Sequence, residues 1–147
     1  MPGGAACGIE ALMDFFSPSA PPGMLPVEGF SWFWRDVAPA EIDLLLPFVL
    51  AADPTGTEAM TWREDACGWL AAAGAGQRIT AVRSASGLTL ALAFSALPAM
   101  GAAMRRLVVE RLRWLELARP HRSLDAALAI LVEQARRLTC LEVFIAR

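Results

Sequence analysis

Metal binding and nucleophilic catalysis depend most often on cysteine and histidine side chains. This chain has three cysteines and one histidine. Cys7, Cys67 and Cys140 lie far apart in the sequence, and His121 is near none of them. Metal sites and disulfide frameworks need closely spaced ligands or cysteines, so we expect neither. One histidine without a nucleophile motif gives no Ser–His–acid arrangement. The sequence also lacks a nucleotide-binding phosphate loop and a dinucleotide fingerprint.

Length and charge restrict the class of protein further. The 147 residues are enough for one domain of ordinary size, and 56% of them are apolar. There is no lysine, the arginines are scattered, and the net charge is −2, so we expect no nucleic-acid partner. Free thiols and an N-terminus without a secretory pattern predict a cytoplasmic protein.

One apolar segment, Leu88 to Met104, approaches the length of a membrane span. Pro98 and Gly101 interrupt it, and a turn signal at Ser86-Gly87 precedes it. We therefore predict a buried strand followed by a loop, and no membrane partner.

The chain divides into an N-terminal extension, residues 1–29, and a domain, residues 30–147. In the extension, Ile9 to Phe16 predicts a short helix with Ile9, Leu12, Met13 and Phe16 on one face. Four prolines in Ser17 to Pro26 exclude regular helix and central strand there.

The sequence of the domain predicts strands and helices in a definite order. Proline at position 39 and acidic residues after it start a helix, and Pro47 should kink or shorten that helix. Ser84 to Gly87 predicts a hairpin turn. The predicted strands are Phe30–Val37, Arg78–Arg83, Leu88–Ser95, Arg106–Ala118 and Cys140–Ala146; the predicted helices begin at Pro39, at Thr57 (to about Ala73) and after Ser123.

Two details of the last elements matter for function. Bulky neighbours at Trp114 and Leu115 indicate either a β-bulge or a strand covered on both faces. Ser123 is a good N-cap for the last helix, whose apolar stripe comprises Leu124, Ala127, Leu128, Leu131, Ala135 and Leu138. The order strand, helix, helix, strand, strand, strand, helix, strand predicts an α/β domain, with a mixed (α+β) sheet covered by helices on both faces.

This order resembles the GNAT acetyltransferase superfamily from its first strand through its fifth. The best local match is Leu115 to Leu124 (LELARPHRSL) with the helix end Glu133 to Cys140 (EQARRLTC), and Trp34 to Pro39 (WRDVAP) resembles the family's first strand and helix start. The resemblance covers residues 30–147. It implies transfer of an acyl group from acetyl-CoA or another acyl-CoA to an amine of a small molecule or peptide.

The resemblance also implies where the cofactor would bind. The family's phosphate-binding loop falls on Arg122, Asp125 and Ala127, at the start of a helix whose free N–H groups favour anions. Asp125 stands where the family has glycine. It either repels the phosphates or simply stabilises the helix start. The implied cofactor-binding residues are Leu115, Leu117, Arg122, Ser123, Leu124, Asp125, Ala126 and Ala127.

The implied catalytic residues lie on the family's fourth strand. Glu110 and Glu116 are the candidate bases, with a solvated strand face as the alternative reading of both. The family's usual tyrosine is absent because the chain has no tyrosine. Cys140 is read as a small buried apolar residue rather than a proton donor. His121 is either a phosphate contact or an exposed loop residue.

GNAT members usually add a helix and two strands after the fifth strand. The sequence ends at Arg147, directly after that strand, so its edge should be open. We expect a second copy, in a homodimer, or the N-terminal segment to cover it. The alternative functions are a catalytically inactive GNAT-like module for partner binding or dimer assembly, and an acyl-CoA sensor.

Overall fold

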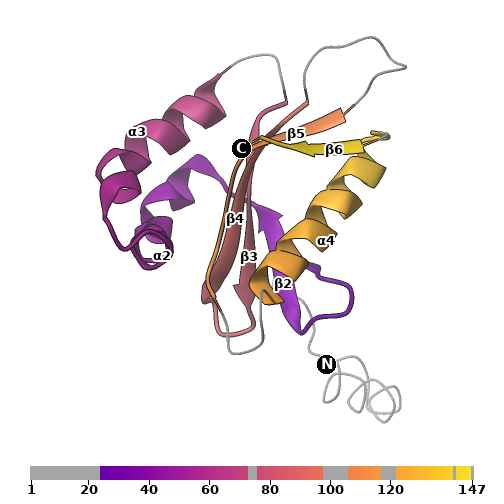
Figure 1. Ribbon diagram of the computed structural model, residues 1–147, viewed down its shortest axis with the longest axis horizontal. Helices are drawn as coiled ribbons and strands as arrows, with labels where there is room; N and C mark the ends of the chain where they lie inside the picture. Colours follow the sequence, from indigo (N-terminus) through magenta and orange to yellow (C-terminus); the bar gives the residue numbers. More distant parts are fainter. Residues whose placement is uncertain (1–23, 73–75, 98–105, 117–121, 141, 147) are drawn as a thin grey trace, which may run out of the picture.

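The computed structural model describes residues 24–72, 76–97, 106–116, 122–140 and 142–146. Several predicted features lie outside these residues: the helix at Ile9 to Phe16, most of the loop after residue 96, Leu117 and His121. The elements in chain order are β1 (Leu25–Pro26), β2 (Trp32–Asp36), the 3-10 helix η2 (Pro39–Leu45), α2 (Leu46–Ala52), α3 (Thr57–Ala71), β3 (Arg78–Ser84), β4 (Thr89–Ala96), β5 (Arg106–Trp114), α4 (Arg122–Arg137) and β6 (Glu142–Ile145) (Figure 1).

One mixed sheet forms the centre of the domain, as predicted. Its strands lie in the order β1 to β6, and each pair is antiparallel except β5 and β6, which are parallel. The helix α4 makes the crossover between these two parallel strands, because parallel neighbours cannot be joined by a tight turn. The short strand β1 was not predicted. It holds Pro26 at the sheet edge, where the missing N–H of proline is tolerated.

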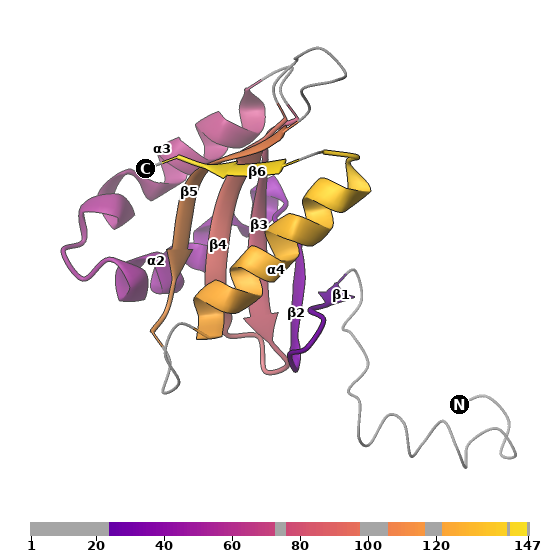
Figure 2. The same ribbon diagram turned by 45° about the vertical axis from the view of Figure 1, so that its right-hand side comes forward.

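Helices cover both faces of the sheet, which confirms the predicted layers (Figures 1 and 2). On one face α4 packs over a core that includes Leu107, Val109 and Ile130. On the other face η2, α2 and α3 pack over a core that includes Ile79, Phe94 and Trp62. Every residue of β4 is buried between the two layers, which confirms the predicted buried strand in the apolar segment from Leu88. No helix in the described part of the chain is both long and apolar enough to span a bilayer.

Local sequence signals explain several element boundaries. The first helical segment divides at Leu45 into η2 and α2, immediately before Pro47, as proline predicts. The β3–β4 turn is closed by a hydrogen bond from Gly87 N to Ser84 O of 2.9 Å. Gly87 has a φ of 92°, a value that glycine adopts without steric cost.

The helix α4 differs from its prediction in two ways. It begins at Arg122, so Ser123 lies inside its first turn rather than at the N-cap. Its buried face is also rotated: the polar Gln134 is 2% exposed, whereas the predicted core residue Leu128 is 37% exposed. Gln134 donates to the hydroxyl of Thr80 at 2.7 Å, and this buried bond holds the rotated face against β3.

A β-bulge occurs in β5, but at Glu110 rather than at Trp114 and Leu115. The pairing with β4 passes from Ser95 opposite Val109 to Phe94 opposite Arg111, so Glu110 is the extra residue. The bulge switches the parity of the strand, and both Val109 and Leu112 therefore face α4. At Trp114 and Leu115 the strand is instead covered on both faces, because the two side chains pack into the cores on opposite faces of the sheet.

Candidate functional site

The candidate site begins at the point where β5 leaves β6. The parallel pairing ends at Val109 opposite Ile145, one residue before the bulge at Glu110. Beyond it, β5 continues along β4 and turns away from β6, as Figure 2 shows. We call this point the fork. A bulge at a fork leaves one residue's backbone outside the regular ladder, where it can serve a ligand.

The fork places the two predicted bases very differently. Glu110 is the bulged residue itself and is exposed to solvent. Glu116 lies past the end of β5, also exposed, and takes part in an interaction of its own. The chain stays paired with β4 as far as the Leu115 N–H, so the two residues are separated by extended strand of about 20 Å, at about 3.3 Å per residue. The two carboxylates therefore do not form one acid–base pair, and only Glu110 is at the fork.

The backbone of Leu115, a predicted donor to the cofactor, is already engaged. Its N–H donates to the carbonyl of Leu90 at 2.9 Å. The backbone donor that the resemblance implied at Leu115 is therefore used by the sheet in this structure. Leu117, the other residue of that pair, lies outside the described residues.

The remaining predicted cofactor-binding residues lie at the start of α4. Ala126 and Ala127 are buried in the core beneath the helix, and Leu124 is half-buried against the same core. Asp125 is exposed. The guanidinium of Arg122 lies over the ring of Phe30 at 4.6 Å and near Trp32 at 6.0 Å, a cation–π arrangement that ties the helix start to the loop before β2.

Two buried hydroxyl groups were not predicted to belong to the site. Ser123, in the first turn of α4, and Ser95, on β4 opposite the bulge region, are each 0% exposed. Among the described residues neither hydroxyl has a hydrogen-bond partner. A buried polar group without a partner costs about 1–3 kcal/mol, so such groups are expected to have a partner in the functional state.

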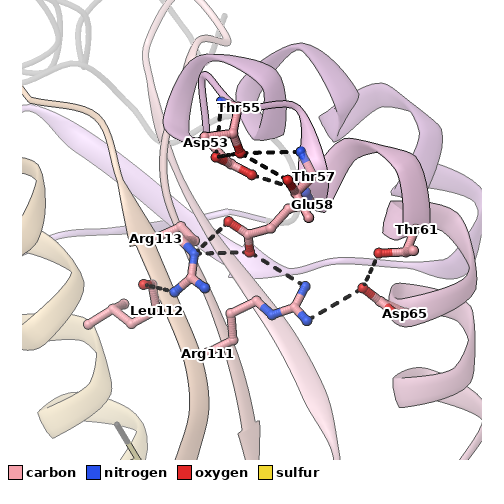
Figure 3. Close-up of polar contacts among 9 residues, drawn as sticks. All are labelled: Asp53, Thr55, Thr57, Glu58, Thr61, Asp65, Arg111, Leu112 and Arg113. Carbon is pink, nitrogen blue, oxygen red and sulfur yellow. Dashed lines mark hydrogen bonds and ion pairs between the residues drawn. The ribbon is translucent and has the colours of Figure 1, made fainter.

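A network of charged residues lies on the face of β5 that α3 covers, in the part of the strand that follows the bulge (Figure 3). The carboxylate of Glu58, on α3, accepts from Nε of Arg113 at 2.9 and 3.0 Å. Arg111 approaches Glu58 at 3.8 Å and Asp65 at 3.4 Å, and its guanidinium lies 4.9 Å from the ring centre of Phe94. The network therefore joins α3 to the half of β5 that follows the fork.

Asp53 positions Glu58 in this network. Its carboxylate accepts from the hydroxyl of Thr55 at 2.6 Å and from the backbone N–H of Glu58 at 3.0 Å (Figure 3). The hydrogen bond from the Thr55 side chain, and then that from the Glu58 N–H, hold the pKa of Asp53 below its usual value. Asp53 therefore stays ionised at neutral pH and holds the start of α3 in place.

This network was not predictable from the sequence. Arg111 and Arg113 alternate on a strand, which is a signal, but their face depends on the bulge between them and Val109. Glu58 and Asp65 lie on a helix whose sequence shows little amphipathic pattern, so nothing local indicated their partners. The described residues include no group of three or more His, Cys, Asp or Glu side chains that could hold a metal ion.

These features define the class of fold. A mixed sheet with one parallel pair, a bulge in the strand before the crossover helix, and helices on both faces give this chain a GNAT-like fold.

Solved structures support this assignment at low sequence identity. A GNAT family acetyltransferase from Staphylococcus aureus aligns with a TM-score of 0.63 and 12% identity, over 80% of this chain and 87% of the other. A probable acetyltransferase gives 0.62 and 13%, over 78% of each chain. The aminoglycoside N-acetyltransferase AAC(6')-Iy in complex with CoA gives 0.56 and 12%, over 88% of this chain and 81% of the other. No protein-family model matches the sequence. No curated protein matches it either.

Proposed function

We propose that this chain is an acyl-CoA-dependent N-acyltransferase, which transfers an acetyl or other acyl group to an amine of a small molecule or peptide. The observation that carries the proposal is the bulge at Glu110, placed where β5 and β6 separate. It brings an exposed carboxylate and an irregular backbone to the same point. The CoA complex of the similar aminoglycoside N-acetyltransferase supports acyl-CoA as the donor.

The residues at the fork and at the start of α4 fit such a donor. The first turn of α4 offers backbone N–H groups that have no helical acceptor, and these favour phosphate. Arg122 is held at the same helix start by the ring of Phe30. These residues would hold the phosphates and the adjoining chain of the donor.

Acyl-CoA, when bound, supplies an activated acyl group. Glu110 takes the proton from the acceptor ammonium, so that the nitrogen lone pair is free to form the C–N bond. Backbone N–H groups at the bulge would stabilise negative charge on the acyl oxygen. Transfer would replace the C–S bond of the donor by the new C–N bond, and the thiolate would take its proton from solvent; the chain has no tyrosine for this role.

Acetyl-CoA binding tests the donor directly. We expect micromolar binding by the native chain in isothermal titration. Asp125→Asn should bind up to about fivefold more tightly, because it removes a negative charge worth up to about 1 kcal/mol beside the phosphates while keeping the side-chain size. Asp125→Gly should also bind, since glycine is the residue that the family has at this position.

Asp43→Asn is the matched control, because it changes the net charge equally on η2, away from α4. Binding that tightens equally in this control would assign the effect to net charge rather than to Asp125. Absence of binding by both the native chain and Asp125→Gly would overturn the acyl-CoA-dependent function.

Exposed apolar residues on the strand β6 also favour assembly of this chain with a second copy. On β6 the described residues Phe144 and Ile145 are 50% and 37% exposed, and β6 pairs with β5 along one edge. We propose that a second copy of this chain covers this strand. The native chain should sediment as a dimer, and Ile145→Asp should shift it toward monomer. Leu44→Asp, which replaces an apolar residue that is 71% exposed on η2, should leave the dimer intact. A monomeric native chain would contradict this assembly.

A further inference from the structure

A groove of about 840 Å³ lies between β1 and α4, away from the fork. Trp34 contributes to its lining from β2, Leu25 and Pro26 from β1, and Ile130 from α4. It belongs to neither the fork nor the charged network, because β1 and β6 are at opposite edges of the sheet. Its size is that of a site for a ligand or a short segment of chain.

The walls of this groove are apolar side chains that solvent reaches. Leu128 and Val132, one turn apart on α4, are 37% and 50% exposed. Leu25 faces the same groove from β1 and is 36% exposed. Adjacent exposed apolar residues that line a hollow indicate a surface that another element covers. The rotation of α4 that buries Gln134 is what turns Leu128 toward the groove rather than the core.

We propose that residues 9–16 of this chain form an amphipathic helix that docks in this groove. The spacing of Ile9, Leu12, Met13 and Phe16 places four apolar side chains on one face. The described chain begins at Met24, next to Leu25 on the groove wall, so this segment is attached at the rim. The occupant is therefore a part of the same molecule.

The connecting residues have the length that docking requires. Residues 17–23 contain three prolines and span up to about 22 Å in an extended polyproline conformation, at about 3.1 Å per residue. The 16 residues of α4 form a helix about 24 Å long, at about 1.5 Å per residue. The segment can therefore lie beside α4 without strain in the connection.

Charge neither favours nor opposes this arrangement. Residues 1–23 contain Glu10 and Asp14 and no basic residue. The groove is bordered by Arg136 and Arg137, which pair with Glu133 at 3.5 and 3.0 Å, and by a second carboxylate, Glu28. Docking therefore depends on the apolar contacts. An eight-residue helix is not stable alone in water, so it forms only when docked. The short tether supplies an effective concentration in the millimolar range, so weak apolar contacts are sufficient.

Hydrogen–deuterium exchange on the full chain tests this docking. We expect the amides of residues 13–16, which have acceptors within such a helix, to exchange at least about tenfold more slowly than in an unstructured peptide. Leu12→Asp and Val132→Asp should each abolish this protection, because each places a charge in the apolar contact. Ala11→Asp, on the opposite face of the segment, and Met60→Asp, which alters an 87% exposed residue of α3, should retain it.

Three results would overturn the proposal. The first is exchange of residues 13–16 at the unstructured rate in the native chain. The second is protection that survives both Leu12→Asp and Val132→Asp. The third is protection that increases with protein concentration, because it would assign the groove to the segment of another copy. Ala11→Asp adds the same charge to the same segment, so loss of protection in Leu12→Asp alone does not reflect unfolding of the domain.

Discussion

Replacement of Glu110 by glutamine should lower kcat for acyl transfer by about 10²–10⁴-fold, with little change in the KM for acetyl-CoA. Glutamine keeps the size of the side chain but cannot accept a proton from the acceptor ammonium. The measurement is thiol release from acetyl-CoA with a panel of amines: peptide N-termini, polyamines and aminoglycosides. Among the variants considered, this one should have the largest effect on activity, because Glu110 is the carboxylate that the bulge places at the fork.

The pH dependence provides a second readout for the same variant. Without a base, the reaction depends on amine that is already deprotonated, a fraction that rises with pH up to the pKa of the acceptor. The rate of Glu110→Gln should therefore keep rising with pH above the point at which the native rate levels off. Glu116→Gln is the matched control and should stay within about twofold of native activity, because Glu116 lies about 20 Å along the strand from the fork. Loss of activity in Glu116→Gln but not in Glu110→Gln would contradict this role of Glu110 and identify Glu116 as the base.

Replacement of Trp62 by alanine should destabilise the fold by about 3–5 kcal/mol. Trp62 is 2% exposed and is, with Ala66, one of the two buried residues of α3, whereas Trp69 of the same helix is half-buried against Phe94. Its ring packs 5.8 Å from that of Phe94, and its Nε1 donates to the carbonyl of Ile42 at 2.7 Å. A domain of this size is stable by about 5–15 kcal/mol in total, so the loss is a large fraction. Urea denaturation measures it as a lower midpoint.

Trp62→Phe separates the two contributions of this residue. Phenylalanine keeps an aromatic ring against Phe94 but leaves the Ile42 carbonyl without its buried donor, which should cost about 1–3 kcal/mol. The alanine variant should also weaken the charged network, because Glu58 and Asp65 lie on the same helix. A destabilisation below about 1 kcal/mol for Trp62→Ala would show that α3 is held mainly by contacts other than this ring.

The helices, strands and turns were predictable because the residues that determine each of them lie within a few positions of one another. The break before Pro47 follows from a missing N–H and a steric clash within one turn. The β3–β4 turn follows from the freedom of Gly87 to adopt a positive φ. The order of strands and helices then restricted the topology to a mixed sheet with helices on both faces, since parallel neighbours need a crossover.

The position of the bulge was not predictable in the same way. Residues 106–115 are apolar on both parities at several positions, because helices cover both faces of the sheet. Alternation alone therefore could not locate the slip, and Trp114 and Leu115 were the more conspicuous pair. The slip is determined by the register against β4, which is a property of two strands together.

By itself the sequence determined the class of fold, the α4 crossover and the presence of a carboxylate at position 110. Tertiary structure decided that Glu110 is the bulged residue and that the Leu115 N–H is used within the sheet. It also decided that Glu58 meets Arg113 across 55 residues of sequence. The physical reason is the same in each case. Periodicity and capping act within a few residues, whereas register, helix rotation and ion pairing depend on atoms that only folding brings together.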